Sequence, residues 1–163
     1  MKPSMMGSSL FLLTLAFAAC TGQTASMDNN PSSDTPTVDF CDLVRSPSRY
    51  DGKVVRTEAI VAVGFEIAIV YDPKCGDHDK RAWYTFDESS YQPDEKGWKS
   101  LRALLFPASN QRSGHYNGRA KATMVGRFDA SDKNGYGHMN SCRFQFTIMR
   151  VERVQAVPSD VPD

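Results

Sequence analysis

The chain has 163 residues, with 19 basic and 19 acidic side chains and therefore no formal net charge at pH 7. This balance gives no electrostatic reason to expect a nucleic-acid partner, because such partners favour a basic surface. Residues 38–157 are enough for one ordinary domain, and they contain no apolar stretch long enough to span a bilayer.

The N-terminal segment predicts export. Lys2 precedes an apolar stretch over residues 10–19, which is about half the length of a membrane-spanning helix and ends in two alanines before Cys20. The segment resembles a bacterial lipoprotein signal peptide over residues 1–19, which implies that Cys20 is lipidated and becomes the first mature residue. An ordinary cleaved signal or an uncleaved helix is the alternative. Lipid on Cys20 would anchor the protein to a membrane in the cell envelope. Thr21, in place of Asp, favours the outer membrane in a Gram-negative cell.

Three further segments follow the signal. After Cys20, residues 21–37 contain no aromatic, leucine, isoleucine or valine side chain, so they cannot bury enough apolar surface to offset the entropy of ordering. We therefore expect a disordered tether over residues 20–37, a folded domain over 38–157 and a short C-terminal tail over 158–163.

The first half of the domain predicts a short helix and three strands. The helix covers residues 38–44 and is ended by Pro47, before a turn at Asp51 and Gly52. Gly64 separates the first two strands and invites a bend or a hairpin. The predicted strands span residues 53–63, 65–71 and 82–86, with a polar loop over 72–80.

The second half predicts one helix and two more strands. Residues 94–106 carry apolar side chains at helical spacing, with Asp94 as the expected cap and Pro107 as the stop. Alternation over residues 120–128 predicts the fourth strand. A fifth strand begins at residue 144 and continues to 154, with a slip in the apolar phase after Ile148.

This order predicts a mainly β domain. Five strands with one helix between the third and the fourth are typical of the oligonucleotide/oligosaccharide-binding (OB) fold, a five-stranded barrel. We expect the strands to be antiparallel and a short helix to precede the barrel. An open antiparallel sheet with the helix on one face is the alternative.

Short strings along the domain also resemble a known group. They are YDGK at 50–53, GFE at 64–66, YDPKC at 71–75, GRF at 126–128 and GYGH at 135–138. The domain resembles small uncharacterised bacterial exported lipoproteins with an OB-like barrel. The resemblance implies this fold and export, and it implies no particular activity.

The domain contains three cysteines. Cys41, Cys75 and Cys142 allow three different single disulfides, and a pair persists outside the cytoplasm. Cys41 with Cys75 is the preferred pair, because both lie at the edges of regular elements, and Cys142 is expected to be buried in a strand. No two cysteines have the close spacing of a zinc motif.

The candidate ligand site is the loop before the last strand. Tyr136, His138 and Asn140 surround two glycines that allow sharp turns, and Glu66 at the start of the second strand could face the same region. A His138–Glu66 hydrogen bond would fix the imidazole tautomer. The alternative, which we favour, is that these groups satisfy the loop's own backbone.

The other polar and aromatic residues give weaker indications of function than the loop before the last strand. Residues 77–79 (Asp-His-Asp), with His115 elsewhere, invite a metal hypothesis, yet a solvated loop fits them better. We expect no metal site, no cofactor and no catalytic constellation, because no known catalytic motif is found. The simplest interpretation of Arg56, Glu58 and Arg127 is that they occupy outward positions on strands with alternating side chains. The third predicted strand contains three aromatic residues that could stack on a base or a sugar, Trp83, Tyr84 and Phe86. Aromatic side chains in such a strand more often belong to the core.

The leading hypothesis is a non-enzymatic envelope lipoprotein that binds a small molecule, a glycan or a protein. The alternative is an extracytoplasmic hydrolase that uses His138 and Glu66, with or without a metal. Nucleic-acid binding ranks third.

Overall fold

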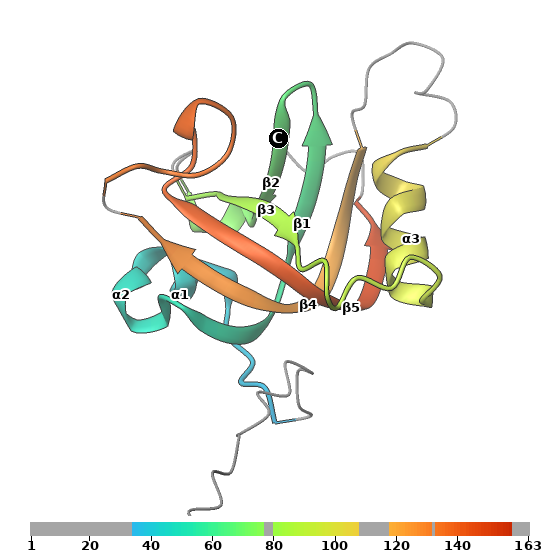
Figure 1. Ribbon diagram of the computed structural model, residues 1–163, viewed down its shortest axis with the longest axis horizontal. Coiled ribbons are helices and arrows are strands. Elements are labelled where there is room, and N and C mark those ends of the chain that lie inside the picture. The colour runs from blue at the N-terminus through green and yellow to red at the C-terminus, as the bar shows by residue number, and fades with distance from the viewer. Residues whose placement is uncertain (1–33, 77–79, 108–117, 132, 158–163) are drawn as a thin grey trace, which may run out of the picture.

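The computed structural model describes residues 34–76, 80–107, 118–131 and 133–157. The predicted signal segment, Cys20, most of the predicted tether and the predicted C-terminal tail lie outside these residues. In the described part of the chain, no helix is long and apolar enough to cross a membrane. The elements, in chain order, are α1 (Phe40–Arg45), α2 (Pro47–Tyr50), β1 (Lys53–Gly64), β2 (Ile67–Tyr71), η1 (Pro73–Cys75), β3 (Ala82–Phe86), α3 (Lys96–Leu105), β4 (Gly118–Ala130), η2 (His138–Asn140) and β5 (Phe144–Ala156) (Figure 1).

The five strands form one mixed sheet that closes in a ring. The order around the ring is β1-β2-β3-β5-β4, and β4 pairs with β1 along eleven positions. The predicted class, the five strands and the place of the helix between β3 and β4 are confirmed. The expectation that all strands are antiparallel is wrong, because β3 and β5 run parallel from Ala82↔Phe144 to Phe86↔Ile148. The crossover through α3 and β4 returns the chain to β3 in the same direction, which local sequence patterns do not reveal.

The interior of the ring is filled by the alternating apolar side chains of the long strands. On β1, the buried residues Val55, Thr57, Ala59 and Val61 face inward with a period of two. Phe128 of β4, together with the inward side chains of β5, completes the centre of the core.

The last strand changes phase, as its sequence predicts. Phe144, Phe146 and Ile148 are buried, and the next buried residue is Val151. Two register shifts in the β4–β5 pairing mark bulges at this point. A bulge adds a residue on one strand and bends it, so β5 can follow the curvature of the ring and still keep apolar side chains inside.

Helix α3 covers one end of the ring and contacts mainly β5 and β4 (Figure 1). It buries Trp98, Leu101 and Leu105, three of the residues that its predicted periodicity places inward. The helix begins at Lys96 with Glu95 as the capping residue, not at the expected cap Asp94. The Glu95 amide donates to the carbonyl of Gln92, so Asp94 belongs to the preceding turn.

The chain enters the domain beside the first half of β1, on the edge that β2 leaves unpaired. The amide of Val38 donates to the carbonyl of Arg56, and the Arg56 amide donates to the carbonyl of Pro36, both at 2.8 Å. The Arg56 guanidinium also donates to the carbonyl of Thr35 at 2.7 Å. Residues 35–38 are therefore fixed on β1 next to Arg56, just before the helix α1.

A disulfide joins Cys41 on α1 to Cys75 on η1, which is the pair preferred on sequence grounds. The S–S distance is 2.15 Å and the Cα atoms are 5.0 Å apart. The bridge ties the N-terminal helix to the connection between β2 and β3. Cys142 is free and buried, and burial raises the pKa of its thiol.

Candidate functional site

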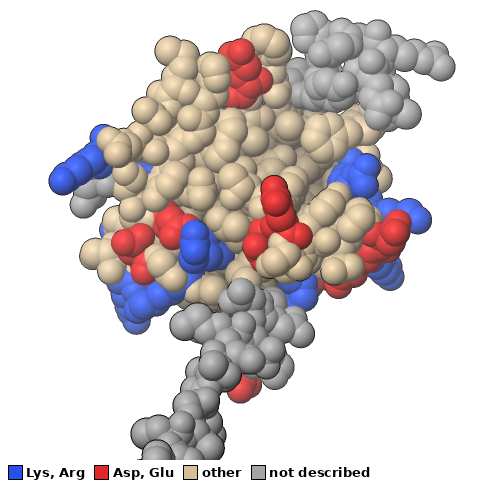
Figure 2. Space-filling view, viewed as in Figure 1, with Lys and Arg blue, Asp and Glu red and all other residues tan. Residues whose placement is uncertain are grey.

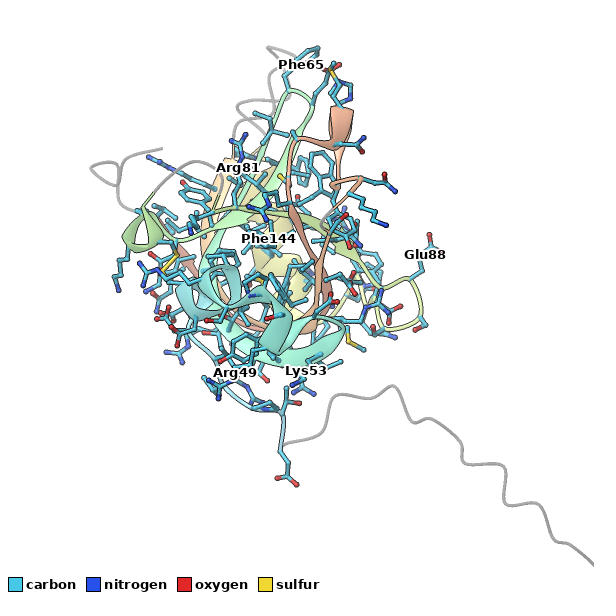
Figure 3. All side chains as sticks on the ribbon, turned by 90° about the vertical axis from the view of Figure 1, so that its left-hand side faces the viewer. Arg49, Lys53, Phe65, Arg81, Glu88 and Phe144 are labelled. Atoms are coloured by element: carbon cyan, nitrogen blue, oxygen red, sulfur yellow. A yellow bond between two sulfur atoms is a disulfide. The ribbon has the colours of Figure 1, made fainter. Side chains whose placement is uncertain are left out.

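Two connections meet at one end of the molecule. The first is the two-residue turn of Phe65 and Glu66 between β1 and β2, and the second is the segment 131–143 between β4 and β5, which contains η2. Figure 3 labels Phe65 at the tip of the β1–β2 hairpin, with the η2 segment beside it. The Glu66 carboxylate lies 3.4 Å from Nε2 of His138, and both side chains are about half exposed, at 53% and 48%. The structure therefore brings two of the four predicted site residues together.

The backbone of both connections adopts an uncommon conformation. In the described part of the chain, the non-glycine residues with positive φ are Glu66 at 56°, Met139 at 52° and Asn140 at 57°. Such φ values are unfavourable for side chains other than glycine, asparagine and aspartate. Observed backbone strain of this kind clusters at functional sites, so it supports a role for this end of the molecule.

Gly137 seats the η2 segment on β3. Its φ of 78° and ψ of −167° belong to a region that is essentially limited to glycine. A Cβ at this position would lie 2.1 Å from Cε3 of Trp83, so the backbone rests directly on the indole ring. Because this contact covers part of the ring, Trp83 is a support for the loop and not an open stacking platform.

The other two predicted site residues lie elsewhere in the segment. The backbone of Tyr136 pairs with that of Cys142. Burial, followed by the negative charges of Asp129 and Asp51, raises the pKa of the Tyr136 hydroxyl, so this side chain lies toward the end of β4. Asn140 is exposed, and its backbone amide donates to the carbonyl of Gly137.

The strand segments on one side of the ring carry no charged residue, and Arg81 and Arg143 lie just before two of them. β2, β3 and the first six residues of β5 contain no lysine, arginine, aspartate or glutamate. We define the uncharged face as the outward side chains of these segments, which are Ile67, Ile69, Tyr71, Trp83, Thr85, Gln145 and Thr147. Figure 2 shows a broad tan region over the part of the view in which Figure 1 draws β3 and the β1–β2 hairpin, with an acidic side chain at the tip of that hairpin.

The polar groups on this face are neutral and bond to one another. The Thr85 and Thr147 hydroxyls are 3.2 Å apart, and the Gln145 amide donates to the Thr147 hydroxyl at 3.5 Å. Tyr84 and Phe86, the other aromatic residues of β3, face the opposite way. Burial raises the pKa of Tyr84 to about 12, and Phe86 packs edge-on against Trp98. These two rings therefore lie on the inward side of β3, where Tyr84 is buried and Phe86, at the end of the strand, is 37% exposed.

Exposed apolar side chains mark the end of the uncharged face. The apolar tip, as we call it, consists of Phe65, Ile67 and Met139, which are 76%, 45% and 86% exposed. The Glu66–His138 contact lies within it. Sequence reasoning missed Phe65 and Met139 as site residues. The feature that could have identified them is a large apolar side chain next to the turn residues of each loop.

The remaining sequence candidates are ion-paired or lie outside the described residues. Arg56 pairs with Glu152, Glu58 with Lys121, and Arg127 with Asp129. Residues 77–79 and His115, which suggested a metal, are not among the described residues. Within the part of the chain that is described, no group of three or more His, Cys, Asp or Glu side chains could hold a metal ion.

Comparison with protein-family models, with curated proteins and with solved structures finds no significant match to this chain.

Proposed function

We propose that this protein is a non-enzymatic binding module of the bacterial cell envelope, anchored by lipid on Cys20. Its ligand is an uncharged surface of a glycan, a small molecule or a protein, and it binds at the apolar tip and on the adjoining uncharged face. The observation that carries the proposal is the division of the ring by charge, since the side without charges ends at the two strained loops.

The proposal includes the finer fold, an OB-like barrel. The strand order around the ring, the helix between β3 and β4 and the closed sheet support it. In OB folds, ligands bind on strands 2 and 3 between the loop that joins strands 1 and 2 and the loop that joins strands 4 and 5. Here these are the elements that carry Trp83, the Phe65–Glu66 turn and the η2 segment.

The proposal places the domain outside the cytoplasm, at the outer membrane in a Gram-negative cell. Radiolabelled palmitate should enter the full chain and should not enter the Cys20→Ser chain. Equal labelling of both chains, or no labelling of the first, contradicts the anchor.

Site-specific photocrosslinking in intact cells tests the binding surface. A photoreactive amino acid at Phe65 or at Met139 should give a defined adduct, because both side chains project from the apolar tip. The matched control is Lys99, an exposed residue on α3. Adducts of equal yield at all three positions, or none at the tip, would exclude this surface as the binding site.

The Glu66–His138 contact supports a second candidate, a hydrolase in which the carboxylate orients the imidazole as a general base. A hydrolytic rate on envelope glycans or peptides that collapses in His138→Ala, and persists in Lys133→Ala on the same segment, would favour this enzyme over the binding module.

A further inference from the structure

The methionines of the described residues differ sharply in exposure. Met139 in η2 is the most exposed of the large apolar side chains that the structure describes. Met124 on β4 is completely buried inside the ring, and Met149 on β5 is partly buried. Oxidants attack a thioether sulfur where they can reach it, so Met139 should react before the other two.

The backbone of η2 holds Met139 at the surface. Its φ of 52° and ψ of 26° are unfavourable for a side chain of this kind, so the surrounding structure must maintain them. The amide of Asn140 donates to the carbonyl of Gly137 at 3.1 Å, and the Ser141 amide donates to the carbonyl of His138 at 3.2 Å. These bonds close the turn around Met139, and Gly137 seats the turn on β3, so the exposure is a fixed feature of the fold.

Met139 is also part of the proposed binding surface. It is one of the three residues of the apolar tip, and it follows His138, whose Nε2 lies 3.4 Å from the Glu66 carboxylate. Glu66 in turn follows Phe65, the other strongly exposed residue of the tip. A change in polarity at the Met139 sulfur therefore changes the surface against which the proposed ligand packs.

We propose that Met139 is a site of reversible oxidation that switches off ligand binding at the apolar tip. The inference rests on the proposed function, since it needs a domain outside the cytoplasm, where conditions are oxidising, and a ligand at the tip. The oxidant is hydrogen peroxide. The thioether sulfur bonds to one peroxide oxygen, the O–O bond breaks and the second oxygen leaves as water. Sulfur gives up two electrons, and the peroxide accepts them.

The product, methionine sulfoxide, places a polar S=O group where the tip was apolar. Its oxygen would lose water on contact with an apolar ligand surface and gain no donor there, so ligand affinity should fall by about tenfold or more. A methionine sulfoxide reductase reverses the step, because two of its thiols form a disulfide and the sulfoxide oxygen leaves as water. Since the side chain of Met139 is outside the core, the fold should be the same in both states.

Peptide mass spectrometry measures the oxidation of each methionine separately. Cleavage after lysine and arginine places Met124, Met139 and Met149 in different peptides, which are residues 122–127, 134–143 and 144–150. The full chain with Cys20→Ser is incubated with hydrogen peroxide, and its cysteines are alkylated before digestion. Peptide 134–143 should gain the mass of one oxygen atom about tenfold faster than peptide 122–127, and unfolding in urea should remove the difference.

Photocrosslinking in intact cells, with the photoreactive amino acid in place of Phe65, tests the switch itself. Hydrogen peroxide should lower the adduct yield in the chain that retains Met139. Met139→Leu keeps an apolar side chain without an oxidisable sulfur and should preserve the adduct, whereas the matched control Met149→Leu should still lose it. Met139→Gln imitates the polarity of the sulfoxide and should lower the yield by about tenfold without peroxide. Circular dichroism shows whether each variant is folded.

Three results would overturn the switch. They are equal oxidation rates of the three peptides in the folded chain, an adduct at Phe65 that persists after Met139 is fully oxidised, and an equal loss with peroxide in Met139→Leu. Absence of the Phe65 adduct before any oxidant is added contradicts the proposed function and removes the switch with it, so the two failures are distinguished.

Discussion

Replacing Gly137 by alanine tests whether the η2 segment is seated on Trp83. The φ of 78° and ψ of −167° at Gly137 cost a side-chain-bearing residue about 1–3 kcal/mol. The added Cβ also meets the indole at 2.1 Å, and such overpacking costs a further ~1–3 kcal/mol. We expect Gly137→Ala to lower the free energy of unfolding by about 2–6 kcal/mol in urea denaturation followed by circular dichroism.

A second glycine separates these two contributions. Gly76 has a similar backbone, with φ of 88° and ψ of −131°, but no heavy atom lies within 4 Å of its ideal Cβ position. Gly76→Ala should therefore lose only the backbone contribution, about 1–3 kcal/mol. In a Trp83→Leu background, the effect of Gly137→Ala should fall to that of Gly76→Ala. If the two glycine substitutions have equal effects in the unsubstituted protein, the loop does not rest on the indole and the site geometry is refuted.

Three further measurements address the rest of the molecule. Replacing both Cys41 and Cys75 by alanine opens a loop of 34 residues and should lower the free energy of unfolding by about 3–4 kcal/mol in urea, and a loss below ~1 kcal/mol would contradict this. Hydrogen bonds from Arg56 hold the pKa of Glu152 below 4.5, so this carboxylate stabilises the folded state above that pH and the contribution is lost as the pH falls. Glu152→Gln should flatten the dependence of stability on pH between about 5 and 3, and an unchanged slope would show that the pair does not contribute. Burial raises the pKa of Tyr84 from 10 to about 12, so its stabilising effect is complete below pH 10 and declines as the pH rises toward 12. Absorbance titration should show fewer tyrosines ionising near pH 10 in the native chain than in the urea-unfolded chain, and Tyr84→Phe should reduce that difference, with the remainder due to Tyr136, whose pKa is also raised.

The parts of the fold that depend on local periodicity could be predicted from the sequence. β3 has the predicted bounds, and the slip in phase after Ile148 is present as bulges in β5. β2 begins at Ile67 and not at Phe65, because the chain reverses in a two-residue turn in which Glu66 takes a positive φ that its side chain disfavours. The parallel pairing of β3 with β5 joins segments far apart in the chain, and no local pattern encodes it.

The candidate site was predictable only in part, for a related reason. Glu66 and His138 lie far apart in the sequence. They meet because the β1–β2 turn and the β4–β5 connection lie at the same end of the molecule. Tyr136 lies only two residues from His138, yet its backbone pairs with Cys142 and its side chain lies toward Asp129. Neighbours in a tight turn point in different directions, so closeness in sequence did not imply a shared site.

The position of β5 in the ring has a consequence for how the protein is made. This last strand pairs with both β3 and β4, and its contacts include Thr85 with Thr147, 62 residues apart. Such distant contacts form only after a long loop has closed, which slows folding to the millisecond-to-second range typical of β proteins. The ring therefore cannot close until β5 has been synthesised and is free to pair. A chain that ends before β5 leaves β3 and β4 with open edges, which are targets for aggregation and for proteases.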